Sequence, residues 1–224
     1  MNKRFYQTAS LIVVFLFSTT VIGCASLSKT EKGAGAGAGA GAVIGGAIGA
    51  ATGSTAKGAI VGAAVGGVAG AVIGQQMDKQ AEELAEDLEG AEVERVGEGI
   101  QITFDSAILF GFDSAEISEP AQMNLNNLAA SLGEYPGTEL VIVGHTDAVG
   151  EEAYNQELSE ERAGSAAAYL AQQGIPADRI TTFGKGETEP VASNDTEFGQ
   201  QQNRRVEMAI FASEEYREEV STTN

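Results

Sequence analysis

The C-terminal half of the chain contains four short segments with the hydrophobic pattern of β-strands. Residues 99–104 alternate apolar and polar side chains, which is typical of a half-buried strand, whereas residues 140–144 are apolar almost throughout and fit a buried one. Residues 180–183 and 205–211 are two further runs of strand length, rich in β-branched or aromatic residues. The pattern therefore predicts four strands.

Helical spacing of apolar residues separates these strands. One helix is predicted from Ser118, its N-cap, to the stop at Tyr135-Pro-Gly, and a second from Glu151 to Gln173. The resulting order β-α-β-α-β-β predicts an α/β (α+β) domain over residues 97–213, with a mixed four-stranded sheet and two helices.

Two polar segments flank this domain. Residues 78–96 are acidic with a narrow apolar stripe, which predicts an exposed helical connector. Residues 214–224 are polar and are expected to form a frayed tail.

Residues 33–77 carry glycine at every fourth position, from Gly33 to Gly53 and again from Gly58 to Gly74. Residues four apart share one face of a helix, so the two series predict a helical hairpin packed glycine face to glycine face. Glycine costs about 1 kcal/mol relative to alanine in a water-exposed helix, which favours association with a membrane or with a second copy of the chain. A flexible low-complexity spacer is the alternative.

The N-terminus has the three parts of a secretory signal peptide over residues 1–23. Lys3 and Arg4 precede an apolar run at residues 11–17, and a small residue stands before Cys24. The run is too short to span a bilayer comfortably. An ordinary signal peptide or an anchor helix with an incidental cysteine is the alternative interpretation.

The sequence Val-Ile-Gly-Cys at residues 21–24 resembles a lipobox, the site at which bacterial lipoproteins are cut and acylated. The resemblance implies that Cys24 is the lipidated first residue of the mature chain and that residues 24–32 are a linker. Two or more long acyl chains hold a protein on a membrane essentially permanently. Ala25 stands where an aspartate signals inner-membrane retention, so the expected location is the outer membrane, with the C-terminal domain in the periplasm.

Charge and residue counts exclude several classes of function. The net charge is −19, and residues 78–224 hold 31 of the 32 acidic residues, so binding of nucleic acid through basic patches is excluded. A single cysteine and a single histidine exclude a disulfide framework, a Cys/His zinc site and a Cys-His catalytic pair. We therefore expect no metal, no cofactor and no catalytic residue.

A set of short motifs runs through the last 115 or so residues: Phe110-Gly-Phe-Asp-Ser114, Gly144-His-Thr-Asp147, Gly150, Asn155, Leu158-Ser159, Arg162-Ala163, Tyr169-Leu170, Gly174, Arg179, Gly184, Gly186, Pro190 and Asn203-Arg-Arg-Val-Glu207. As a set, these motifs resemble the OmpA-like peptidoglycan-binding domain family. Together with the lipobox and the glycine repeat, the whole chain resembles an outer-membrane lipoprotein of the YiaD type with a glycine zipper. One departure is Gln200, where the family usually has an arginine that would contact a phosphate-like group or a carboxylate.

The resemblance implies a site for diaminopimelate, whose distal end carries an ammonium and a carboxylate on one carbon. Asp147 would accept from the ammonium, and Arg162 would give a planar two-donor grip on the carboxylate. Asn155 and Thr146 are the implied hydrogen-bonding neighbours. The alternatives are that Asp147 only caps the following helix and that Arg162 only pairs with helix glutamates.

Three further residues are expected at the edge of this site. Phe112 and Asp113 would close another side of the pocket, and Arg205 would be a secondary site residue. Arg204 is expected to order the last strand against acidic neighbours.

The leading hypothesis is a lipid-anchored outer-membrane protein that binds peptidoglycan non-covalently and tethers the membrane to the wall. The alternative is a factor for membrane or outer-membrane-protein assembly, driven by the glycine zipper, in which wall binding only localises the protein. An enzyme is disfavoured because no nucleophile has an assigned base. An ion-conducting stator would need an ionisable group inside a spanning helix, and the zipper offers only Lys57.

Overall fold

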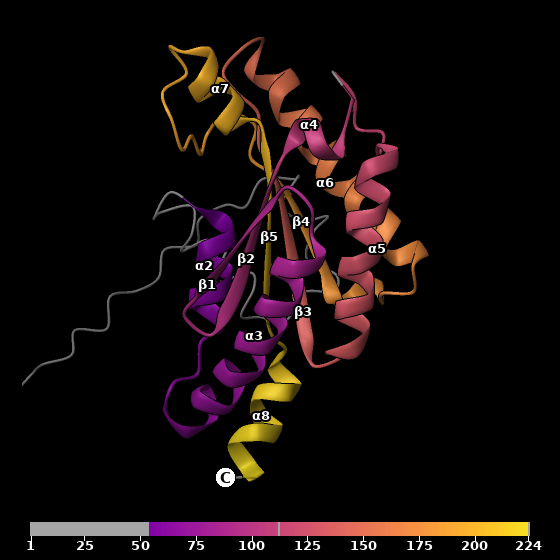
Figure 1. The fold of residues 1–224 in the computed structure, drawn as a ribbon. Coiled ribbons are helices and arrows are strands. Elements are labelled where there is room, and N and C mark those ends of the chain that lie inside the picture. The colour runs from indigo at the N-terminus through magenta and orange to yellow at the C-terminus, as the bar shows by residue number, and fades with distance from the viewer. Residues whose placement is uncertain (1–53, 112, 224) are drawn as a thin grey trace, which may run out of the picture.

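The computed structural model describes residues 54–111 and 113–223, which build a twisted five-stranded sheet (Figure 1). The strand order is β1-β2-β5-β3-β4, and only the β3–β4 pair is parallel. The strands are β1 (Ala91–Val96), β2 (Gly99–Asp105), β3 (Thr138–Gly144), β4 (Ile180–Gly184) and β5 (Arg205–Ala212).

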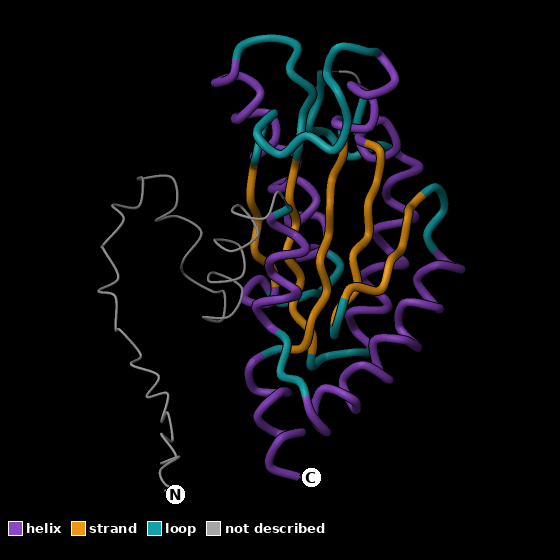
Figure 2. The backbone as a smooth tube through the Cα atoms, turned by 90° about the vertical axis from the view of Figure 1, so that its left-hand side faces the viewer, coloured by secondary structure: helices purple, strands orange, loops and turns teal. Residues whose placement is uncertain are grey.

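Helices cover both faces of the sheet, so the fold has three layers (Figures 1 and 2). The main core joins α3, α5 and α6 to one face, while α2 packs on the other face. The helices are α2 (Thr55–Ala63), α3 (Gly67–Asp87), α4 (Ser106–Leu109), α5 (Glu119–Glu134), α6 (Glu152–Gln172), the 3-10 turn η1 (Ala177–Arg179), α7 (Glu197–Asn203) and α8 (Glu214–Thr223).

The α+β class and all six predicted elements of the domain are present. Helix α5 begins as expected, because the Ser118 hydroxyl accepts from the Ala121 amide and a proline occupies the first turn. Its buried leucines, at positions 125, 128 and 132, face the sheet.

The prediction of four strands and of a helical connector to residue 96 is wrong. Helix α3 ends at Asp87, the chain turns at Gly90 with φ 72°, and β1 then pairs antiparallel with β2. In β1 the exposed Glu92 and Glu94 alternate with the partly buried Val93. These charges suit an edge strand, because they discourage pairing with another chain. They also made the alternation of polar and apolar residues hard to recognise within an acidic stretch.

The predicted second arm of the glycine hairpin, from Gly58 to Gly74, is not one helix. It is divided between α2 and α3, and both Gly66 and Gly67 have left-handed φ values, 72° and 65°. The Glu98 carboxylate accepts from the backbone N–H groups of Val65 and Gly66, each at 2.7 Å, and so fixes the break. The first arm lies outside the described residues. No described helix combines the length and the apolar character that crossing a membrane requires.

The frayed tail predicted from residue 214 is also wrong, because this segment forms α8. Its Tyr216 packs against the main core and donates its hydroxyl to Gln76 Oε1 at 2.6 Å, while Val220, one helical turn on, is buried. Arg217 donates to the Ala63 carbonyl at 3.0 Å. An apolar pair four residues apart is enough to dock an otherwise polar helix.

Candidate functional site

The loops that follow β3 and β4 gather with α7 at one end of the sheet, opposite the end where α8 lies (Figures 1 and 2). Asp147 lies in the first of these loops and is only 6% exposed. Antiparallel pairing places Gly144 opposite Val206, so the residues just before β5 lie beside the Asp147 loop. This register brings Arg204 to Asp147.

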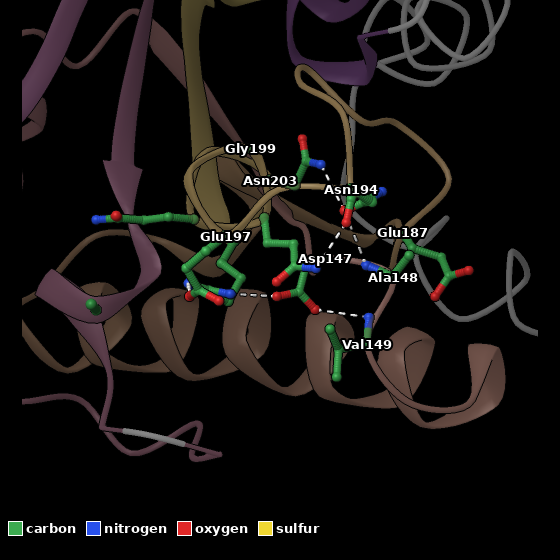
Figure 3. A network of polar contacts seen from close by, with 12 residues as sticks. Asp147, Ala148, Val149, Glu187, Asn194, Glu197, Gly199 and Asn203 are labelled. Atoms are coloured by element: carbon green, nitrogen blue, oxygen red, sulfur yellow. Dashed lines mark hydrogen bonds and ion pairs between the residues drawn. The ribbon is translucent and has the colours of Figure 1, made fainter.

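The Asp147 carboxylate is held at both oxygens (Figure 3). Arg204 Nη1 lies 2.5 Å from Oδ2, and the Val149 amide donates to Oδ1 at 3.0 Å. Arg204 also reaches Glu197, with 3.3 Å between Nη2 and Oε1. Arg204, expected only to order the last strand, is therefore the cation that positions Asp147.

Arg162 enters the site from the middle of α6 and is 6% exposed. Its Nε donates to the Ser114 carbonyl at 3.0 Å, and its guanidinium lies 5.4 Å from the centre of the Phe110 ring. Burial lowers the pKa of Arg162, and the negative charges of Asp113 and Asp147 oppose that shift. In the described part of the chain Arg162 forms no ion pair, so it stands near Asp147 without neutralising it.

Asn155 and Thr146 both lie beside Asp147. The Asn155 side-chain amide donates to the Asp147 carbonyl at 3.2 Å and to Glu187 Oε2 at 2.7 Å. The Thr146 amide donates to the Gly186 carbonyl at 2.9 Å, while its hydroxyl oxygen is buried without a partner among the described residues. Loops after two different strands thus meet around Asp147.

Of the two residues expected to close the pocket, Phe112 lies outside the described residues. Asp113 has φ 51° and accepts a hydrogen bond of 2.5 Å from the hydroxyl of Tyr154. This bond raises the pKa of Tyr154, because it favours the protonated phenol. Asp113 contributes negative potential at Arg162.

Arg205 is not brought to Asp147, although we expected a secondary role for it in the site. Alternate residues of a strand share a face, so Arg205 lies on the α2 side of the sheet with Ala209 and Phe211, whereas Arg204, the residue before β5, reaches Asp147. Arg205 is buried there, with Nη2 2.8 Å from Glu207 Oε1 and 3.1 Å from the Glu189 carbonyl.

Neither of the simpler alternatives describes the observed contacts. Asp147 bonds the Val149 amide within its own loop, and the N-cap residue of α6 is Glu151, which makes no side-chain capping bond. Arg162 contacts Ser114 and Phe110 rather than glutamates of its own helix.

Sequence reasoning missed Asn194, which ties the second loop to the first. Its Oδ1 accepts from the Ala148 amide at 3.2 Å and from Asn203 Nδ2 at 2.8 Å (Figure 3). Gln200, the departure from the family pattern, donates to the Asn194 carbonyl at 2.8 Å. A neutral amide at position 200 therefore serves the loop itself.

Comparison with known proteins agrees with this architecture. The family model described as OmpA family matches residues 109–204, and a YMGG-like Gly-zipper model matches residues 1–78. The outer-membrane lipoprotein YfiB of Pseudomonas aeruginosa is 37% identical over 115 residues, which cover 51% of this chain and 68% of that protein. The chain belongs to the OmpA family. This family is a non-enzymatic peptidoglycan-binding domain, here preceded by a Gly-zipper segment.

Other relatives share the domain within different proteins. The probable lipoprotein YiaD of Escherichia coli K12 is 39% identical over 121 residues, covering 54% of this chain and 55% of that protein. The structure of the cell wall anchor of the T6SS from Pseudomonas aeruginosa has a TM-score of 0.54 and 32% identity, covering 60% of this chain and 97% of that one. The chain spans only 14 to 58% of the length of several other curated relatives that it matches.

Proposed function

We propose that Asp147 and Arg162 bind the zwitterionic end of diaminopimelate in peptidoglycan stem peptides. The observation that carries this proposal is that the two opposite charges are both buried in one site and that each is positioned by a third group. Arg204 and the Val149 amide hold Asp147, and the Ser114 carbonyl holds Arg162. A zwitterion calls for such a fixed anion and fixed cation that do not neutralise each other.

Both side chains retain capacity for a ligand. A carboxylate has about four acceptor positions, of which Asp147 uses two, one for Arg204 and one for Val149. Arg162 uses Nε for Ser114, and its Nη1 and Nη2 donate to no protein group in the described part of the chain. These two nitrogens form the fork that matches a carboxylate.

The test is binding of the full chain to muropeptides that contain either meso-diaminopimelate or lysine at the third position. Lysine lacks the distal carboxylate, so the wild-type protein should prefer the diaminopimelate form. Asp147→Asn and Arg162→Gln should each weaken that binding about 10- to 100-fold, the effect of losing a hydrogen bond to a charged group.

Asp178→Asn is the matched control. Asp178 is exposed in η1, and the substitution removes one negative charge, as Asp147→Asn does. Circular dichroism confirms that each variant is folded. Unchanged binding by both folded site variants, or equal affinity for the two muropeptides, would show that the site lies elsewhere.

We further propose that Cys24 is acylated and fixes the chain in the outer membrane, so that wall binding tethers membrane to peptidoglycan from the periplasm. The signal-peptide pattern at residues 1–23 and the likeness to the lipoproteins YfiB and YiaD support this. Mass spectrometry of the mature N-terminus should find an acylated Cys24. An unmodified cysteine, or an uncleaved signal peptide, would refute the anchor.

The Gly-zipper match supports a second role, self-association or assembly at the membrane, with wall binding as a localisation device. Gly66 lies at a helix break and Gly70 faces Glu98, so we assign self-association to the first glycine series. Changing Gly41, Gly45 and Gly49 to leucine should abolish crosslinked oligomers. Oligomers that survive this change would argue against the role.

A further inference from the structure

Helix α2 is attached to the sheet through a small apolar face. Three alanines and one isoleucine make up that face, so little apolar area holds the helix compared with the leucine-rich face of α5. The cluster consists of Ala56, Ala59, Ile60 and Ala63 of α2 with Val141 and Val143 of β3 and Ala209 and Phe211 of β5.

Polar contacts at the N-terminus of α2 complete the attachment. The Thr55 amide donates to Glu189 Oε2 at 3.0 Å, its hydroxyl donates to Oε1 at 2.6 Å, and the Ser54 hydroxyl donates to Glu207 Oε2 at 3.2 Å. Both carboxylates are buried, and they face the helix end where negative charge is favoured. If α2 leaves the sheet, Glu189 loses both of these hydrogen bonds.

The loop that carries Glu189 also builds the Asp147 site. Within residues 185–196, the Gly186 carbonyl accepts from the Thr146 amide, Glu187 accepts from Asn155, and Asn194 accepts from the Ala148 amide. One loop therefore contacts α2 at its centre and the Asp147 loop on either side of that point. Two neighbouring arginines repeat the link: Arg204, just before β5, holds Asp147, and Arg205, the first residue of β5, donates to the Glu189 carbonyl.

We propose that α2 is a detachable clasp whose docking on Glu189 stabilises the arrangement of residues 185–196 that positions Asp147. This inference rests on the proposed diaminopimelate site. When α2 detaches from the sheet, the loop of residues 185–196 loses the contact between Glu189 and Thr55, and the affinity of the Asp147 site for the stem peptide falls. Thermodynamic reciprocity requires that the bound peptide in turn stabilise docked α2. Docking of α2 thus couples the N-terminal Gly-rich segment to the affinity of the Asp147 site for peptidoglycan.

The experiment is hydrogen exchange of the full-length chain with and without a muropeptide that contains meso-diaminopimelate. The bound muropeptide should slow exchange of the α2 amides about 5-fold or more, the lower end of typical coupling. Glu189→Gln and Thr55→Val should both speed α2 exchange and weaken muropeptide binding by a similar factor. Lys57→Ala is the control on the same helix, because Lys57 is exposed and its side chain pairs, among the described residues, only with the exposed Glu94. This variant should change neither quantity.

Each outcome separates the clasp from the binding site. If Asp147→Asn abolishes binding while the muropeptide leaves α2 exchange unchanged, the site stands and the clasp is refuted. Faster α2 exchange in Glu189→Gln with unchanged affinity, or unchanged α2 exchange in both variants, also refutes it. If the wild-type chain does not bind the muropeptide, the proposed site fails and the clasp fails with it.

Discussion

The two regions that pack against the sheet, α5 with α6 and the Gly-rich residues 54–70, are attached in different ways. The first region buries long aliphatic side chains. The ends of β3 and β4 approach the α6 backbone so closely that Gly144 and Gly184 leave no room for a Cβ. The second region offers mainly alanine and glycine, and carboxylates from the domain complete its contacts. We therefore expect the first attachment to belong to the cooperative core and the second to open locally.

Truncation of one buried side chain in each region should give the largest difference in the free energy of unfolding, and it tests this comparison. Leu128→Ala in α5 should cost about 2–5 kcal/mol in the free energy of unfolding, because a cavity remains in the main core. Ile60→Ala in α2 should cost less than about 2 kcal/mol, because α2 can undock and so limit the loss. Urea denaturation followed by circular dichroism measures both values.

Hydrogen exchange provides the control for that pair. In Ile60→Ala the α2 amides should exchange faster while those of β3 keep their protection. Equal losses of stability in the two variants would place α2 in the same cooperative unit as α5, contrary to the comparison.

Replacing one glycine by alanine in each region should also distinguish the two regions, with a smaller change in the free energy of unfolding. A Cβ at Gly144 would overlap the backbone of Ser159 in α6, so Gly144→Ala should destabilise the protein by about 1–3 kcal/mol. A Cβ at Gly70 meets only the Glu98 carboxyl, the end of a flexible side chain, and alanine adds up to about 1 kcal/mol of helix propensity. Gly70→Ala should therefore be nearly neutral in the same denaturation assay, and a large loss there would mean that Glu98 is rigidly required.

Much of the α5/α6 region was predictable because hydrophobic period reports directly on burial. The strand β3 and the helices α5 and α6 follow from their apolar spacing, and their register carries Asp147, Asn155 and Arg162 into one site. The contact between Arg204 and Asp147 could also have been predicted. Pairing of the last strand with β3 places the residue before β5 beside the residue after β3.

The Gly-rich region was predicted poorly because its contacts are tertiary. Nothing local marks Glu98 as the group that fixes the break between α2 and α3, or Glu189 as the acceptor for Thr55 more than a hundred residues away. The period-four glycines predicted a glycine face packed against a second glycine helix. In α2 the packed face consists instead of three alanines and Ile60, and it lies on the β-sheet of the same chain.

The smallest predicted effect concerns His145, which lies near the attachment of the second region through Glu207. It is 1% exposed, and its Nε2 is 3.9 Å from Glu207, the acceptor for Ser54. Burial, aided by the positive charges of Arg205 and Lys185, lowers the pKa of His145 well below 6.5. Below pH 6.5 the unfolded chain therefore binds a proton that the folded chain does not, and stability falls as the pH falls.

The slope due to His145 is at most about 1.4 kcal/mol per pH unit, the value for one proton. We expect urea denaturation between pH 7 and 5.5 to show this slope in the wild type and to lose it in His145→Gln. Burial raises the pKa of Glu139 above 4.5, so as the pH falls toward 4.5 the folded chain binds a proton at this carboxyl before the unfolded chain does, and the group contributes a slope of opposite sign in that range. Glu139→Gln should therefore steepen the acid loss of stability as the pH approaches 4.5. Identical slopes in the wild type and His145→Gln would mean that His145 binds the same number of protons in the folded and the unfolded chain, so that burial does not shift its pKa.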